Sequence, residues 1–174
     1  LCRAWETRSL TRETFADYVT KASSTLHVVS GLPRSSRWTE LRIPALRGVW
    51  QQAVANYDVA LIDVGPVIDA EKSFGHEDPL PRRNSVPVTA MQQVSTILLC
   101  SRGDAIGLAR LIRGFDEQSE LFAQANVHVA IWGAGDKTQE VSQAIVRHTG
   151  LTSIVHIPRD DSHVQMALER AQPV

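Results

Sequence analysis

Residues 96–122 read TILLCSRGDAIGLARLIRGFDEQSELF and hold the two patterns that decide the fold. The first, Thr96 to Cys100, is a short, continuous apolar run, which suits a strand buried on both faces. The second, Ile106 to Phe122, has apolar residues at helical spacing and charged residues on the other side. Its apolar stripe consists of Leu108, Leu111, Ile112, Phe115 and Leu121. Asp104 precedes it as a plausible N-cap, so the stretch predicts a buried strand followed by an amphipathic helix.

The same alternation of strand and helix extends in both directions. Four further runs rich in Val, Ile and Leu predict strands: Leu26 to Val29, Val59 to Ile62, Val127 to Trp132 and Ile154 to Ile157. We expect further helices over Thr11 to Ala22, Ala45 to Tyr57, Val86 to Val94, Thr138 to His148 and Ser162 to Ala171. Gly150 follows the Thr138 to His148 helix as a stop signal. Together these patterns predict an α/β fold with a mainly parallel, twisted sheet flanked by helices.

Length and composition are those of an ordinary globular protein. The 174 residues suit a single domain over 1–174, and a net charge of -1 gives no signature of direct nucleic-acid binding. No run approaches the roughly 20 apolar residues of a membrane span. Two cysteines, Cys2 and Cys100, do not suggest a disulfide framework, so we expect a cytoplasmic protein. A long loop is expected over Gly65 to Pro87.

The stretch YDVALIDVGP, residues 57–66, is the first candidate for a functional site. A buried strand here would deliver Asp63 to its carboxyl end, which is the edge where open α/β sheets bind ligands. A carboxylate there can hold Mg²⁺, and Gly65 would let the backbone turn close to a phosphate. The alternative is that Asp63 only caps the following turn.

These ten residues resemble the Tyr-Asp-hydrophobic-Asp-x-x-Pro segment of the MinD/ParA superfamily of deviant Walker P-loop ATPases, which includes CpaE-like proteins. Residues 89–114, with Pro81-Arg82-Arg83-Asn84 before them, resemble the corresponding segment of actinobacterial CpaE-like and septum-site-determining proteins. Residues 157–161, Ile-Pro-Arg-Asp-Asp, resemble the family's Ile-Pro-x-Asp segment. The resemblance covers most of residues 24 to 172 and implies a P-loop NTPase-like fold.

The resemblance implies roles for particular residues. Asp63 would help organise Mg²⁺ and the water that attacks ATP, and Gly65 and Pro66 are further candidates for contact with Mg²⁺ or the nucleotide. Pro158 and Asp160 would lie beside the adenine. No residue is assigned as catalytic, and the six histidines do not have the spacing of a metal site.

Two arginines, Arg82 and Arg83, are candidates for a protein partner or a phosphate, because guanidinium groups bind carboxylates and phosphates bidentately. The alternative is that they form a solvated pair on a loop.

The sequence departs from the family at the phosphate-binding loop, which in the family is glycine-rich with two lysines. None of the three lysines here follows a glycine. The nearest approach, Gly133 to Thr138, has Asp136 before its lysine, where a carboxylate would repel phosphate, so an ordinary polar connection is the favoured interpretation. Trp132 or Gly133 stands where the family has an adenine-reading asparagine. We therefore expect ATP and Mg²⁺ only if the P-loop strand lies upstream of Leu1, in a longer chain of which this is the carboxyl-terminal part.

Three interpretations follow. In the first, the chain is the body of a MinD/ParA/CpaE-like ATPase that is inactive alone and acts in pilus or secretion assembly, septum placement or chromosome partitioning. It would form a homodimer, bind a protein of that machinery, and reach the membrane only through partners. In the second, it is a degenerate, non-catalytic interaction protein of the same fold. In the third, it is a receiver-like domain phosphorylated on Asp63, although residues 30–32, Ser-Gly-Leu, replace the acidic pair such a domain needs.

Overall fold

The computed structural model describes residues 1–32, 35–64 and 85–170. The chain divides into two compact units, Leu1–Gln93 and Val94–Val174, and each is described by itself. The expectation of a single domain remains a prediction.

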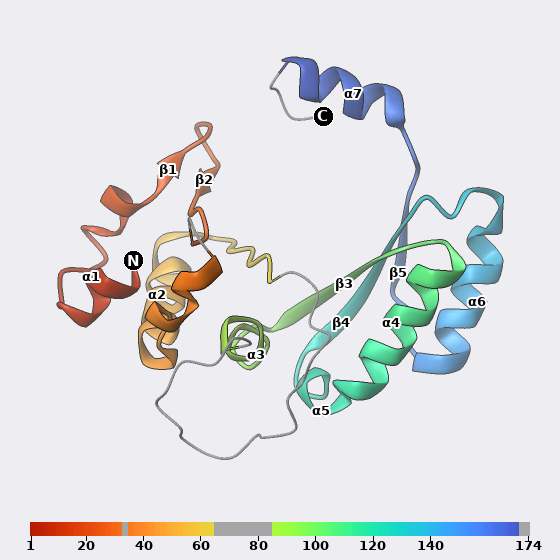
Figure 1. Ribbon diagram of the computed structural model, residues 1–174, viewed down its shortest axis with the longest axis horizontal. Helices are drawn as coiled ribbons and strands as arrows, with labels where there is room; N and C mark the ends of the chain where they lie inside the picture. Colours follow the sequence, from red (N-terminus) through yellow and green to blue (C-terminus); the bar gives the residue numbers. More distant parts are fainter. Residues whose placement is uncertain (33–34, 65–84, 171–174) are drawn as a thin grey trace. The chain divides into compact units, whose positions relative to one another are not determined.

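A parallel sheet forms the centre of the second unit (Figure 1). Its strands are β3 (Thr96–Arg102), β4 (Asn126–Trp132) and β5 (Ile154–Ile157), in the order β3-β4-β5. Arg102 lies beside Trp132, and Trp132 lies beside Ile157, so the three strands end together. The predicted parallel sheet and three of its five predicted strands are confirmed.

Four helices accompany this sheet: α4 (Ala105–Glu117), α5 (Ser119–Phe122), α6 (Thr138–Thr149) and α7 (Asp161–Arg170). The predicted helix over Ile106 to Phe122 is interrupted at Gln118, where the backbone leaves helical geometry. The break allows Phe122 to stack on Phe115, with ring centroids 5.5 Å apart. α6 ends as expected at Gly150, whose φ of 73° lies in the left-handed region that favours glycine.

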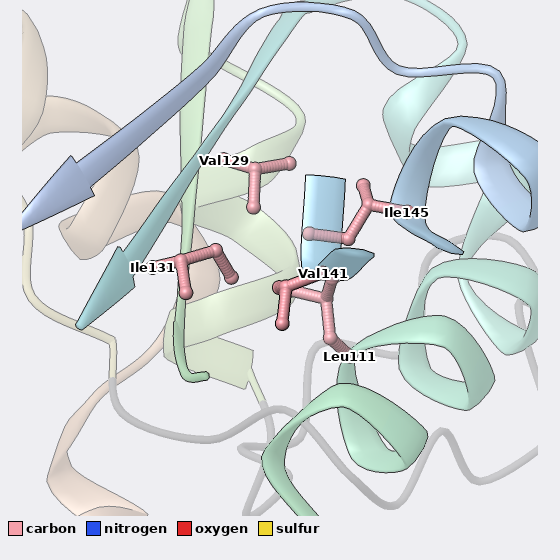
Figure 2. Packing of buried hydrophobic residues seen from close by; sticks show 5 residues of the cluster. All are labelled: Leu111, Val129, Ile131, Val141 and Ile145. Carbon is pink, nitrogen blue, oxygen red and sulfur yellow. The ribbon is translucent and has the colours of Figure 1, made fainter. Parts of the chain in front are cut away.

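The core of this unit lies between the sheet and two helices (Figure 2). It consists of Leu111 from α4, Val129 and Ile131 from β4, and Val141 and Ile145 from α6. Because residues of α4 and α6 join one cluster with β4, both helices cover the same face of the sheet, which we call the covered face. Burying each such aliphatic side chain contributes about 1.5–3 kcal/mol.

The opposite face of the sheet, which we call the open face, carries the alternate residues of the same strands. By strand register these are Thr96, Leu98, Cys100, Arg102, Asn126, His128, Ala130, Trp132, Val155 and Ile157. Leu98 and Val155 are each 57% exposed and Ile157 is 47% exposed. Apolar side chains on this face therefore remain accessible to solvent.

The first unit is mainly helical. Its elements are α1 (Cys2–Glu6), the 3₁₀-helix η1 (Phe15–Tyr18), a hairpin of β1 (Thr20–Lys21) and β2 (His27–Val28), the 3₁₀-helix η2 (Ser35–Glu40), α2 (Ile43–Asn56) and α3 (Ser85–Met91). Its core contains Ala4, Leu10 and Phe15, with Trp5 and Tyr57 packed against them. α2 and α3 correspond to the helices predicted over Ala45 to Tyr57 and Val86 to Val94, although α3 ends three residues earlier than predicted.

Three predictions for the first unit are wrong, and two of them concern residues 11–29. The expected helix over Thr11 to Ala22 is replaced by η1 and β1. The backbone N–H of Thr11 donates to the Thr14 hydroxyl and that of Thr14 to the Thr11 hydroxyl, at 2.9 and 3.3 Å, and such local bonds compete with a helix. The expected strand over Leu26 to Val29 shortens to β2, which is antiparallel to β1.

The strand predicted over Val59 to Ile62 is also wrong. Residues 57–64 are described but belong to no strand, and Val59 and Leu61 are 74% and 93% exposed. A strand is stable only when it is hydrogen-bonded to another strand, and within the described residues this segment joins neither sheet. An apolar run in the sequence does not show whether a second strand is available to pair with it.

Within the described parts of the chain, no helix combines the length and hydropathy needed to cross a lipid bilayer.

Candidate functional site

The carboxyl ends of β3, β4 and β5 form the edge of the sheet where side chains from three turns meet. This is the edge at which open α/β sheets bind ligands. The turns are residues 103–104, which lead into α4, residues 133–137, which lead into α6, and residues 158–160, which lead into α7. We call this set of turns, with the last residue of each strand, the carboxyl edge.

Close backbone packing holds two of these turns together. The Gly103 N–H donates to the Trp132 carbonyl at 2.8 Å, and the Gly133 N–H donates to the Ile157 carbonyl at 3.1 Å. A Cβ on Gly103 would lie 2.5 Å from the Ala134 Cα, a distance that backbone atoms cannot accommodate. Glycine at position 103 therefore permits the first two turns to touch.

Trp132 is the centre of the side-chain arrangement at the carboxyl edge. The guanidinium carbon of Arg102 lies 5.9 Å from the centroid of its ring, and that of Arg159 lies 5.7 Å from it. These distances are typical of cation–π contacts. Arg102 comes from the strand on one side of Trp132, and Arg159 follows the strand on the other side.

Each of these arginines is also paired with a carboxylate. Arg102 Nε lies 2.9 Å from Asp104 Oδ2, and an Arg159 terminal nitrogen lies 2.7 Å from Asp161 Oδ2. The hydrogen bond between Arg159 and Asp161 raises the pKa of the arginine and lowers the pKa of the aspartate. The positive charges next to Trp132 are therefore already balanced by the chain's own carboxylates.

Carboxylates also cap the helices that begin at this edge. The Gly107 N–H donates to Asp104 Oδ1 at 2.7 Å at the start of α4. At the start of α7, Asp160 accepts from the His163 N–H at 3.1 Å and from the Ser162 hydroxyl at 2.8 Å. These hydrogen bonds lower the pKa of Asp160. The bond from the His163 backbone has the largest effect, followed by those from the Ser162 and His163 side chains. Helix N-termini that attract anions are here occupied by aspartates.

The turn between β4 and α6 is short and polar. It contains the short 3₁₀-helix η3 (Gly135–Lys137), and the Thr138 hydroxyl donates to the Gly135 carbonyl at 2.7 Å. Asp136 lies in this turn and is exposed. The hydroxyl of the first residue of α6 is thus bonded to the turn that precedes the helix.

Of the residues predicted for a nucleotide site, Pro158 and Asp160 lie at the carboxyl edge, and both are exposed. Asp63 is exposed in the first unit and follows no strand, because the strand expected before it does not form. Its proposed role with Mg²⁺ stays a prediction. Gly65, Pro66, Arg82 and Arg83 lie outside the described residues.

Histidines elsewhere in the described parts make isolated bonds. His156 Nε2 lies 2.7 Å from the Ser142 hydroxyl, and His128 Nδ1 lies 2.6 Å from the Ser153 hydroxyl. His27 Nδ1 lies 2.7 Å from the Tyr57 hydroxyl. The described residues contain no group of three or more His, Cys, Asp or Glu placed to hold a metal ion.

The sequence did not predict that Arg102, Trp132 and Arg159 would meet. All three follow or end a predicted strand, and that is the only signal in the sequence. Whether they meet depends on strand order and register, which sequence spacing does not define.

Comparisons with known proteins bear on the fold. No protein-family model matches the chain, and no curated protein matches it. Among solved structures, a ParA family ATPase from Chlorobium tepidum TLS is similar, with a TM-score of 0.75 and 16% sequence identity. The match covers 97% of this chain and 65% of that one, so the chain spans less than two thirds of that ATPase. At this identity the likeness concerns the fold alone: the chain has a ParA/MinD-like α/β fold.

Proposed function

We propose that this chain is the body of a MinD/ParA/CpaE-like ATPase used in spatial organisation, and that it does not bind or hydrolyse ATP by itself. The fold supports the first part. The observation that carries the second part is the arrangement of Asp104, Asp136 and Asp160 in the three turns of the carboxyl edge.

A nucleotide brings several negative charges to such an edge. Phosphate oxygens usually accept hydrogen bonds from backbone N–H groups at a helix N-terminus. In this chain the Gly107 and His163 N–H groups already donate to Asp104 and Asp160. A phosphate at the N-terminus of α4 or α7 would have to displace the carboxylate of Asp104 or Asp160 or lie next to it. Two negative charges in contact repel each other.

Nucleotide handling in this proposal belongs to a longer chain with a P-loop upstream of Leu1. Asp63, Gly65 and Pro66 would then face Mg²⁺ and the nucleotide, and Pro158 and Asp160 would face the base. ATP would favour a homodimer, and the dimer would position a protein of a pilus, secretion, septum or partition machinery in the cytoplasm.

The second candidate is an interaction protein that has no nucleotide function. Trp132, flanked by Arg102 and Arg159, is the observation that favours it, because Trp and Arg are the residues most often found at the centres of protein interfaces. A partner would cover this exposed cluster directly.

Nucleotide titration separates these possibilities from an active enzyme. A fluorescent ATP analogue is added to the chain with Mg²⁺, and a P-loop ATPase serves as the positive control. We expect no saturable signal below the millimolar range. Saturation in the micromolar range would contradict the proposal that this chain does not bind ATP alone.

Gel filtration with and without Mg²⁺ and ATP tests the assembly. For this chain we expect one elution volume in both conditions, because the proposed dimer depends on bound nucleotide. An ATP-dependent shift toward a dimer would contradict the proposal.

A further inference from the structure

Two exposed apolar surfaces lie in the second unit. One is the open face of the sheet, with Leu98, Val155 and Ile157. The other is on α7, whose ten residues include none that are buried. Val164, Ala167 and Leu168 are spaced to share one side of this helix, and Val164 and Leu168 are exposed.

The connection between the sheet and α7 is long enough to bring these surfaces together. β5 ends at Ile157 and α7 begins at Asp161, which leaves three residues between them. Two residues, Gly103 and Asp104, suffice to join β3 to α4, which packs on the covered face. A longer link can therefore place α7 against the sheet as well.

A contact in this link shows which face it approaches. Arg159, the middle residue of the link, has its guanidinium over the ring of Trp132. By strand register Trp132 lies on the same face as Ala130, and Arg102, whose guanidinium also lies over the ring, shares this face. The start of α7 is thereby held beside the open face of the sheet.

From these observations we infer that α7 closes over the open face of its own sheet and is held at its start by the contact of Arg159 with Trp132. The dimensions agree. Ten helical residues are about 15 Å long, which is less than the roughly 23 Å of the seven-residue strands β3 and β4. A helix is about 10 Å wide, and three strands span about 10 Å. Running back from the carboxyl edge, the side with Val164 and Leu168 would meet the exposed Leu98 and Val155, whose neighbours on β4 are His128 and the buried Ala130.

Cross-linking to Cys100 tests this closure, because that thiol is exposed on the open face. The full chain would carry Cys2→Ser, so that Cys100 is the single native thiol, together with Val164→Cys. A short bis-maleimide is expected to join the two thiols within one chain, giving a product that migrates as a monomer. Glu169→Cys is the matched control, because position 169 faces away from the apolar side of α7, and it is expected to give little product.

Three outcomes would overturn the inference. The first is a covalent dimer, which would mean that α7 of a second copy covers the face. The second is no cross-link although Cys100 reacts with a monofunctional maleimide. The third is an equal yield from Glu169→Cys. Circular dichroism checks that each variant folds. If the Val164→Cys variant does not fold, Leu168→Cys takes its place in the same test.

A second variant tests the role of the arginine. Arg159→Ala, combined with Val164→Cys, should lower the initial rate of intramolecular cross-linking about two- to five-fold, because one cation–π contact is lost. Arg159→Lys keeps the charge and should restore part of that rate. An unchanged rate in Arg159→Ala would refute the holding contact. None of these readouts depends on nucleotide, so they are independent of the proposed function.

Discussion

Single residues at close contacts determine how neighbouring elements of this chain approach each other. In the first unit the indole of Trp5 lies directly on Gly48 of α2, and a Cβ at that glycine would fall 1.7 Å from the indole nitrogen. In the second unit the ring of Trp132 lies near two guanidinium groups, one from Arg102 at the end of β3 and one from Arg159 in the turn after β5. The contact of Trp5 therefore leaves little room for a larger residue at position 48.

Gly48→Ala should destabilise the protein by about 1–3 kcal/mol, because the ring of Trp5 must shift to admit a methyl group. Gly114→Ala in α4 is the control, since a Cβ there meets nothing within 4 Å. The control should be neutral or stabilising by up to about 1 kcal/mol, because alanine favours a helix more than glycine does. Urea unfolding measures the free energy of unfolding of both variants. Equal changes in the two variants would contradict the close contact between Trp5 and Gly48.

Asp160 should make the start of α7 sensitive to acid. Its pKa is lowered in the folded chain by the His163 N–H and then by the Ser162 and His163 side chains. A lowered pKa means that the stabilisation is present above the unfolded value of about 3.9 and is lost as pH falls through the folded value. The amide resonance of His163 should therefore shift toward an unbonded position below about pH 4. Asp160→Asn keeps a hydrogen-bond acceptor but has no carboxyl group to protonate. In this variant the His163 amide resonance should therefore not shift over the same pH range.

The elements of the second unit were largely predictable, whereas in the first unit local hydrogen bonds replaced the helix expected over Thr11 to Ala22. β3, α4, β4, α6 and β5 follow one another along the chain and pack together, so their apolar patterns sufficed. Val59 to Ile62 has an equally apolar pattern but forms no strand, because composition does not provide a pairing neighbour. Pro158 and Asp160 follow the confirmed strand β5, and their place beside a base stays a prediction. The meeting of Arg102, Trp132 and Arg159 depends on register.

The N-cap of α4 gives a test at the level of one element. Asp104→Ala removes the acceptor of the Gly107 N–H and should cost about 0.5–2 kcal/mol of unfolding free energy. Asp104→Asn, which is an equally good cap, should cost much less. Chemical denaturation followed by circular dichroism compares the two. Equal losses would show that the ion pair with Arg102, rather than the cap, carries the effect of Asp104.

On the scale of the molecule, the second unit depends on one cluster between sheet and helices. Ile145 is fully buried in it, whereas the next residue, Val146, is exposed. Ile145→Ala should cost about 2–5 kcal/mol, since it removes buried methyl groups and leaves a cavity. Val146→Ala is the matched control and should change stability by less than about 1 kcal/mol. Thermal unfolding monitored by circular dichroism distinguishes them, and similar losses would contradict the assignment of the core.

The central claim concerns the whole chain: it has the fold of a ParA family ATPase, and its carboxyl edge is occupied by its own aspartates. The most direct measurement is a nitrogen-15 NMR titration with Mg²⁺ and ATP, with the indole N–H of Trp132 assigned from a Trp132→Phe variant. We expect the resonances of Trp132, Gly133 and His163 to stay in place up to millimolar ATP. Shifts of these resonances that saturate at micromolar ATP would contradict the account.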